Sequence, residues 1–302
     1  MHDPHRRAHT NVRQHRDNRR QAVTVAYELP EIETIRRDLD RDISGRKVKS
    51  AEAASMAVLD RYRNRKSFTS GLVGRKLDSV RRLGLHLLVG LDGEDLLVIR
   101  MGPGSSLRRH PARDAVEPGT ELTITFTQGG QLRLVDPEGD SEAFLVGADE
   151  LMTEVPGLVA LGIDPVGEPI PLNVFAGQVL GREMELKDFL TDDSVIVGLG
   201  DIYSDEVLFH AGLAYNRGSA TLSTQEVRRL YRALIETVHD AIKYRGTSIE
   251  SRPFVDAYGE PGDFGIHLAV YGRAGELSPR SRAPIQRIKL KGSWAYYCDT
   301  QV

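Results

Sequence analysis

One early segment of the chain has apolar residues at helical spacing. Ile32, Ile35, Leu39 and Ile43 stand three or four positions apart, which places their side chains on one face of an α-helix. The spacing therefore predicts an amphipathic helix over residues 32–43.

Strand-like segments follow this helix. They are short, rich in Leu and β-branched residues, and separated by turn signals such as Asp92-Gly93 and Gly129-Gly130. The segments are KLDSV (76–80), LHLLVGL (85–91), DLLVIRM (95–101), ELTITFT (121–127) and QLRLVD (131–136). The pattern predicts an antiparallel β-sandwich.

The pattern becomes helical after a cluster of Pro and Gly at 165–171. The expected helices are VFAGQVLGRE (174–183), LKDFLTD (186–192), DIYSDEVLFHAG (201–212) and TQEVRRLYRALIETVHDAIKYRG (224–246). The apolar face of the last helix contains Val227, Leu230, Leu234, Val238, Ala241 and Ile242. Gly246 is the candidate for its C-cap.

The change of period predicts an α+β fold with two domains and a terminal finger. The expected boundaries are a disordered basic tail over 1–26, a β-sandwich over 27–155, a helical domain over 156–250 and a β-hairpin finger over 251–302. The 302 residues suffice for two domains. No apolar run is long enough for a membrane span and a single Cys excludes an intrachain disulfide, so we expect a cytoplasmic monomer.

Charge argues against strong binding to nucleic acid. The formal net charge is -3, and the tail holds six Arg and two Asp, so the remaining chain has 34 basic and 41 acidic residues. Affinity for duplex DNA comes largely from Lys and Arg that neutralise phosphates. The tail itself is either an arm that binds nucleic acid or a segment without such a role. In the second case it is a solvated extension or the result of a start codon assigned too early.

The segment 270–301 has the outline of a zinc ribbon. Ser278 and Ser281 stand where the first pair of thiolates belongs, and Cys298 and Gln301 stand at the second pair. A structural zinc site needs four Cys or His ligands. We therefore expect neither a metal nor any other cofactor.

Several segments together resemble the formamidopyrimidine-DNA glycosylase and endonuclease VIII family, over about residues 27–302. They are ELPEIETIRRDL (28–39), LVGRKLDSVRRLG (72–84), LKDFLTDDSVIVGLGDIYSDEVLFHAGL (186–213), GTSI (246–249) and HLAVYGRAGE (267–276). The resemblance implies a β-sandwich, a helix-two-turn-helix module and a hairpin finger. It also implies DNA repair by cleavage of an N-glycosidic bond.

Tyr27 stands where the resemblance implies the N-terminal proline, whose amine attacks the sugar C1′. Twenty-six residues precede Tyr27, so its nitrogen is an amide unless the chain is processed or starts later, and a phenol is a weak nucleophile. We expect no imine intermediate and no lyase activity.

Glu28 and Glu31 occupy the two acidic positions of the family. The resemblance implies that Glu28 is a general acid, and a second carboxylate nearby would suit direct hydrolysis. E-L-P-E also has the pattern of a helix start, with Pro30 at the first helical position and the acids favoured by the helix dipole, and the two interpretations can hold together.

The turn Gly198-Leu199-Gly200-Asp201 matches the family's phosphate-binding turn, in which Asn usually stands at position 201. An ionised carboxylate there repels phosphate, and Asp201 is instead a candidate N-cap. Lys187 matches a family lysine, as a phosphate contact or a solvated surface residue. Gly200, Tyr203 and Arg82 are the other residues expected to contact nucleic acid.

Other family positions have drifted. The family's hairpin lysine falls on Leu85, and its finger arginine falls on Ser293. The segment with the methionine wedge reads Arg-Met-Gly-Pro (100–103), and the Arg- and Phe-bearing loop reads Asp-Pro-Glu-Gly-Asp-Ser (136–141). Base flipping normally depends on such wedges and cations.

Two hypotheses follow. The first is a hydrolytic N-glycosidase without lyase activity that acts on a modified base in DNA or on a free nucleoside or nucleotide. The second is a catalytically silent homologue that binds DNA or a protein partner. The retained acids favour the first, and the lost DNA contacts count against duplex DNA in both.

Overall fold

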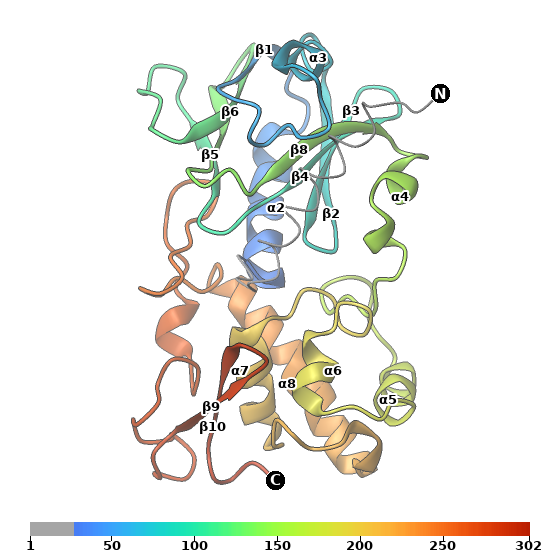
Figure 1. Ribbon diagram of the computed structural model, residues 1–302, viewed down its shortest axis with the longest axis vertical. Coiled ribbons are helices and arrows are strands. Elements are labelled where there is room, and N and C mark those ends of the chain that lie inside the picture. The colour runs from blue at the N-terminus through green and yellow to red at the C-terminus, as the bar shows by residue number, and fades with distance from the viewer. Residues whose placement is uncertain (1–26) are drawn as a thin grey trace, which may run out of the picture.

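The computed structural model describes residues 27–302, so the expected basic tail lies outside the described residues. The chain forms two lobes stacked along the long axis, with β1–β8 (48–147) and most of α2 (Leu29–Ile43) in one lobe and α5–α8 (172–243) with the terminal hairpin in the other (Figure 1). Within the described range, no helix is long and apolar enough to cross a membrane.

The first lobe contains two antiparallel four-stranded sheets. One has the order β1-β6-β7-β5, formed by Val48–Ala53, Thr120–Phe126, Gln131–Val135 and Ser106–His110. The other has the order β2-β3-β4-β8, formed by Leu77–Leu83, His86–Leu91, Asp95–Arg100 and Glu142–Gly147. The expected sandwich is confirmed, and β1, β5 and β8 are strands that the pattern did not indicate.

Helix α2 (Leu29–Ile43) belongs to both lobes. Ile32, Ile35, Leu39 and Ile43 pack in the apolar core of the sandwich, while Leu29 packs in the core of the helical lobe. The predicted helix is confirmed and begins three residues earlier than its apolar pattern.

Short elements connect the larger ones. They are α3 (Arg65–Thr69), α4 (Leu151–Glu154), η1 (Pro156–Leu158), η2 (Ser219–Thr221) and η3 (Phe264–His267). The second core is formed mainly by α5 (Leu172–Leu180), α6 (Leu186–Thr191), α7 (Asp201–Ala211) and α8 (Thr224–Lys243). All four predicted helices are present, and the predicted apolar face of α8 is buried.

The end of α8 differs from the prediction. Its C-cap is Tyr244 rather than Gly246, and Arg245 takes the left-handed conformation with φ 63°. The Gly246 amide donates back to the Ala241 carbonyl at 2.7 Å, which closes a Schellman motif, and the helix therefore ends two residues earlier than expected.

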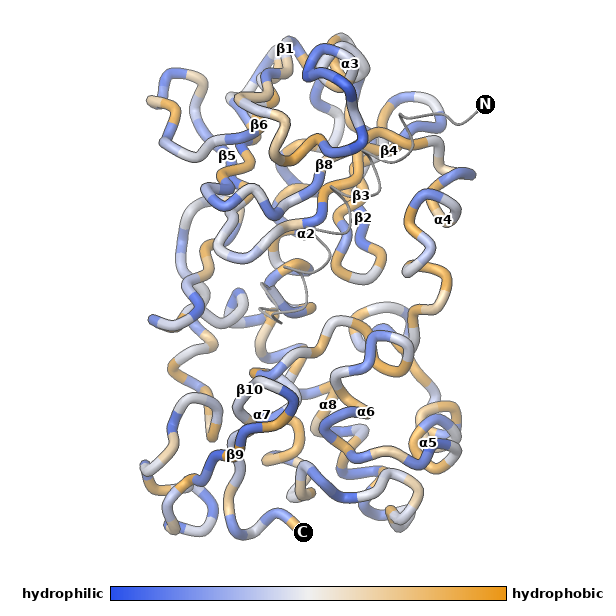
Figure 2. The backbone as a smooth tube through the Cα atoms, viewed as in Figure 1, coloured by the Kyte–Doolittle hydropathy of each residue, from blue (hydrophilic) through white to orange (hydrophobic). Residues whose placement is uncertain are grey.

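The finger is a hairpin of β9 (Gln286–Leu290) and β10 (Ser293–Tyr297), as expected. Figure 2 shows its hydrophilic character along β9, in contrast to the hydrophobic strands β3 and β4. Trp294 is 42% exposed. The Trp294 side chain therefore adds little buried apolar area to the finger.

Hydrogen bonds occupy the positions of the missing zinc ligands. Ser278 Oγ accepts from the amides of Arg280 and Ser281 at 3.3 and 3.5 Å. The Gln301 side chain accepts from the Cys298 amide at 2.8 Å and donates to the Leu213 carbonyl at 2.9 Å. Among residues 27–302, no cluster of three His, Cys, Asp or Glu side chains suits a metal ion.

Candidate active site and nucleic-acid interface

The start of α2 brings two acidic side chains to the junction of the lobes. Glu28 is the N-cap of α2 and Glu31 lies in its first turn, and they are only 2% and 3% exposed. The Glu28 amide donates to Glu31 Oε2 at 3.1 Å. The helix-start interpretation of E-L-P-E is therefore correct, although Leu29 and not Pro30 is the first helical residue.

The Glu28 carboxylate lies at the N-terminus of α7. Its oxygens accept hydrogen bonds from the amides of Gly200, Ile202 and Tyr203 at 2.7, 2.9 and 3.2 Å. A helix N-terminus is a natural anion site. Here a side chain of the protein itself occupies it.

Burial raises the pKa of Glu28, and the three amides and the charge of Arg252 oppose that rise. The guanidinium of Arg252 lies 3.5 Å from Glu28 Oε1. The environment therefore favours the proton but also stabilises the carboxylate after the proton has left.

Glu31 is bound to the residues that follow α8. Its Oε1 accepts from the Thr247 amide at 2.7 Å and from the Tyr203 hydroxyl. Burial, followed by the charge of Glu28, raises the pKa of Glu31 to about 7. Tyr203 is fully buried in this network, so its predicted contact with nucleic acid stays a prediction that these bonds do not favour.

Tyr27 is packed as a core residue. It is 7% exposed, its hydroxyl donates to the Ser105 carbonyl, and its ring meets that of Phe254 edge-on at 5.5 Å. Burial, with the charge of Glu31, raises the pKa of the phenol. A phenol held in this way is a poor nucleophile at neutral pH.

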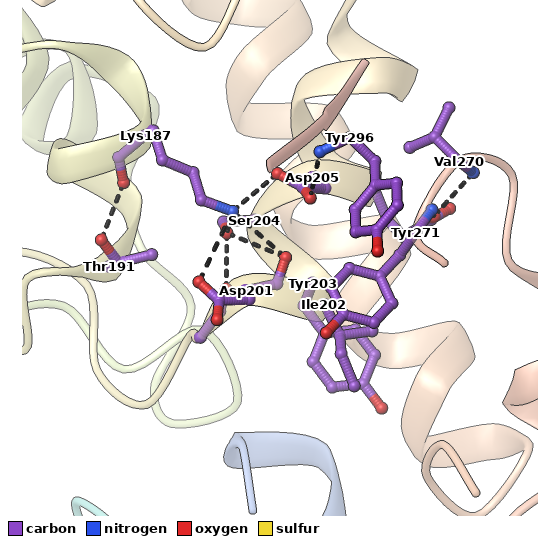
Figure 3. Close-up of polar contacts among 12 residues, drawn as sticks. Lys187, Thr191, Asp201, Ile202, Tyr203, Ser204, Asp205, Val270, Tyr271 and Tyr296 are labelled. Atoms are coloured by element: carbon purple, nitrogen blue, oxygen red, sulfur yellow. Dashed lines mark hydrogen bonds and ion pairs between the residues drawn. The ribbon is translucent and has the colours of Figure 1, made fainter. Parts of the chain in front are cut away.

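Lys187 points into the protein (Figure 3). Its ammonium group contacts Asp205 Oδ1 at 2.6 Å and Ser204 Oγ at 2.8 Å, and the residue is 7% exposed. Burial raises the pKa of Asp205 to about 7, although Lys187 opposes the rise. The interpretation of Lys187 as a solvated surface lysine is wrong.

Asp201 is the first residue of α7, and its N-cap is Gly200. The predicted N-cap role of Asp201 is therefore wrong. Its Oδ2 instead accepts from Arg252 at 3.2 Å, and its Oδ1 lies 3.9 Å from Lys187. The carboxylate thus stays close to two cations at the junction.

Arg82 also makes internal contacts. Its side chain is 5% exposed and contacts Glu33 at 3.2 Å, Asp164 at 2.9 Å and the Gly84 carbonyl at 2.9 Å. A role for Arg82 in binding nucleic acid stays a prediction, and these contacts support a structural role.

Leu85, at the position of the family's hairpin lysine, packs against both apolar cores. Leu85, Tyr27 and Met101 also line a cavity of about 370 Å³, together with Pro103 at the wedge position. The lining of this cavity is mostly apolar, and Arg100 and His86 are the basic residues in it.

Two residues of the site were missed at the level of sequence. Thr247 lies in the matched segment GTSI, but it acts through its backbone amide, which donates to Glu31. A contact made by a backbone amide does not depend on the residue type and so cannot be predicted from the sequence. Arg252 follows α8 in an irregular segment without periodicity, and only the fold brings it to Glu28 and Asp201.

Two family models match the chain. The model described as Formamidopyrimidine-DNA glycosylase N-terminal domain covers residues 27–139. The model described as Formamidopyrimidine-DNA glycosylase H2TH domain covers residues 161–252. The matched ranges include Tyr27, Glu28 and Glu31 in the first and Asp201 and Arg252 in the second.

Relatives match over nearly their whole length. A formamidopyrimidine-DNA glycosylase of Moorella thermoacetica is 34% identical over 262 residues, which cover 87% of this chain and 94% of the relative. That of Geobacillus kaustophilus is 31% identical, with 90% and 97% covered.

Solved structures match the fold as well. The Lactococcus lactis Fpg, in a complex with DNA that contains an abasic site, has a TM-score of 0.80 at 28% identity and covers 91% of this chain and 99% of its own. The MutM (Fpg) protein of Thermus thermophilus has a TM-score of 0.78 at 32% identity, with 91% and 98% covered. These similarities and the two matched domains show that the chain belongs to the formamidopyrimidine-DNA glycosylase family.

Proposed function

We propose that this protein is a DNA-repair N-glycosidase that hydrolyses the bond between a modified base and its sugar without an imine intermediate. The observation that carries the proposal is the buried pair Glu28 and Glu31, whose pKa values burial raises. A carboxyl group with a raised pKa is suited to general acid catalysis.

In the proposed reaction, Glu28 gives its proton to the departing base while a water molecule attacks C1′. The amides of Gly200, Ile202 and Tyr203 then stabilise the Glu28 carboxylate that remains. Glu31 takes up the proton that the water releases, since its pKa of about 7 allows it to exchange protons at neutral pH.

Lyase activity is not part of this proposal. Tyr27 has no secondary amine, and its nitrogen forms a peptide bond with Ala26 in this chain. Its phenol is buried and donates a hydrogen bond to the Ser105 carbonyl. Cleavage through an imine requires an amine at C1′.

The partner is DNA, by analogy with the Lactococcus lactis protein, and the proposed state is a cytoplasmic monomer. A free nucleoside or nucleotide is the alternative substrate. The two are separated by comparing base release from a lesion-bearing oligonucleotide with release from the same modified nucleoside.

A second candidate is a DNA-binding protein without catalysis. The observation in its favour is that three amides and Arg252 already surround the Glu28 carboxylate, which is 2% exposed. In that arrangement the acid is a structural cap, and no proton needs to move.

Base release from a panel of damaged duplexes tests the proposal. Glu28→Gln is expected to reduce release by about 100-fold, a typical loss on removal of a general acid. Glu52→Gln, on the exposed face of β1, is the matched control and should leave release unchanged. Borohydride should not trap a covalent complex with abasic DNA.

Three outcomes contradict parts of the proposal. Efficient trapping would show that an amine has taken over the chemistry. Undiminished release by a folded Glu28→Gln variant would place the acid elsewhere. DNA binding without base release from any substrate would favour the second candidate.

A further inference from the structure

Arg252 is the cation of the junction with the most unused hydrogen-bonding capacity. A guanidinium has five N–H donors. Within residues 27–302, the Arg252 guanidinium makes one hydrogen bond, to Asp201 Oδ2 at 3.2 Å. Its contact with Glu28 Oε1, at 3.5 Å, is an ion pair without such a bond.

The guanidinium is also within reach of solvent. Its side chain is 22% exposed, compared with 2% for the side chain of Glu28. It lies over the Tyr271 ring at 5.7 Å from the centroid. Tyr271 and Ser251, the residue before Arg252, line an open cavity of about 550 Å³.

Lys187, by contrast, has protein partners for its ammonium group and is buried. Its ammonium group has three protein partners, the Asp205 carboxylate, the Ser204 hydroxyl and the Asp201 carbonyl, at 2.6, 2.8 and 3.2 Å. It is also 7% exposed. A phosphate at the start of α7 would therefore meet Arg252 before it met Lys187.

We propose that Arg252 binds a backbone phosphate of DNA next to the turn before α7, where position 201 of this chain is a carboxylate that cannot donate a hydrogen bond. A backbone phosphate of DNA accepts hydrogen bonds from the free N–H groups of the guanidinium and draws it away from Glu28 and Asp201. This inference rests on the proposed binding of DNA.

Asp201 lowers the affinity of this contact for phosphate. Its carboxylate competes with phosphate for Arg252 and repels phosphate directly. Because the same guanidinium stabilises the ionised form of Glu28, its movement toward a phosphate leaves Glu28 with a greater affinity for its proton. Binding of DNA would then prepare the general acid.

Salt titration of binding to a labelled duplex with an abasic site tests the role of Arg252. Loss of one phosphate contact reduces the slope of log affinity against log salt by about 0.9. We expect this reduction in Arg252→Gln and a retained slope in Arg252→Lys. A merely structural arginine would not change the slope.

Asp201→Asn is expected to bind about tenfold more tightly, because one negative charge near the phosphate is removed. The control is Arg75→Gln. Arg75 is also paired with two carboxylates, Asp92 and Asp95, at 27% side-chain exposure, but it lies in the other lobe.

The outcomes separate this inference from the proposed function. An unchanged slope in a folded Arg252→Gln protein that binds DNA overturns only the role of Arg252. If that variant does not fold, unchanged affinity in Asp201→Asn overturns it. Failure of both the wild type and Asp201→Asn to bind any duplex overturns the DNA partner as well.

Discussion

Glu31 is a buried carboxyl group that accepts three hydrogen bonds and lies near the charge of Glu28. Thr247, Tyr203 and the Glu28 amide donate to it, and Glu28 repels its ionised form. Its raised pKa means that the folded protein binds the proton of Glu31 more tightly than the unfolded chain does. Folding and protonation are therefore linked at this residue.

Glu31→Gln should change how stability depends on pH. The stabilisation from the raised pKa is fully present below the ordinary value of 4.5 and is lost as pH rises toward about 7. The difference in melting temperature, wild type minus variant, should therefore decrease as the pH is raised from 4.5 to about 7. Thermal melts followed by circular dichroism measure it, with Glu52→Gln as an exposed control. A constant difference would contradict the shift.

At the scale of elements, the turn before α7 depends on a glycine. A Cβ added at Gly200 would lie 2.7 Å from Glu28 Oε1, whereas one at Gly177 in α5 would meet nothing within 4 Å. The first position has no room because the Glu28 carboxylate fills it. The second is an ordinary helical site.

Gly200→Ala should therefore destabilise the protein by about 1–3 kcal/mol, the cost of overpacking a filled site. Gly177→Ala should stabilise it by about 0.5–1 kcal/mol, because glycine is unfavourable inside a helix. Urea unfolding measures both. Equal effects of the two variants would mean that Glu28 does not fill the turn.

The finger is a second element whose stability depends on side-chain hydrogen bonds. Gln301→Ala removes the acceptor of the Cys298 amide and the donor to the Leu213 carbonyl. It should cost about 1–3 kcal/mol and speed exchange of the Cys298 amide hydrogen. Gln225→Ala, at the exposed start of α8, is the control. Chelators should leave both proteins unchanged, and a chelator-sensitive melt would contradict a metal-free finger.

On the scale of the whole molecule, periodicity predicted most of the fold because Ile, Leu and Val repeat with the period of each element. It missed β1 (Val48–Ala53), β5 and β8, of which β1 and β5 contain few apolar residues. The resemblance located Glu28, Glu31 and Lys187. It did not predict what surrounds them, because Thr247, Arg252 and the amides before α7 meet these residues only after the chain folds.

Leu85 is expected to couple the lobes. It packs against both cores, and its side chain would lie 2.9 Å from a Cβ at Gly198 in the turn before α7. Leu85→Ala should lower the melting temperature and broaden or split the calorimetric transition, because the lobes lose a shared apolar contact. Leu180→Ala, exposed at the end of α5, should not. A single sharp transition in both variants would contradict the coupling.

The contacts of Glu28 give a reason for its retention in evolution that does not depend on catalysis. The side chain satisfies three amides of α7, and its own amide closes the start of α2, so it joins the two lobes whatever happens at a glycosidic bond. A lineage that lost its substrate would still lose stability on replacing Glu28, because buried amides without partners are costly. Selection for folding alone would therefore preserve Glu28.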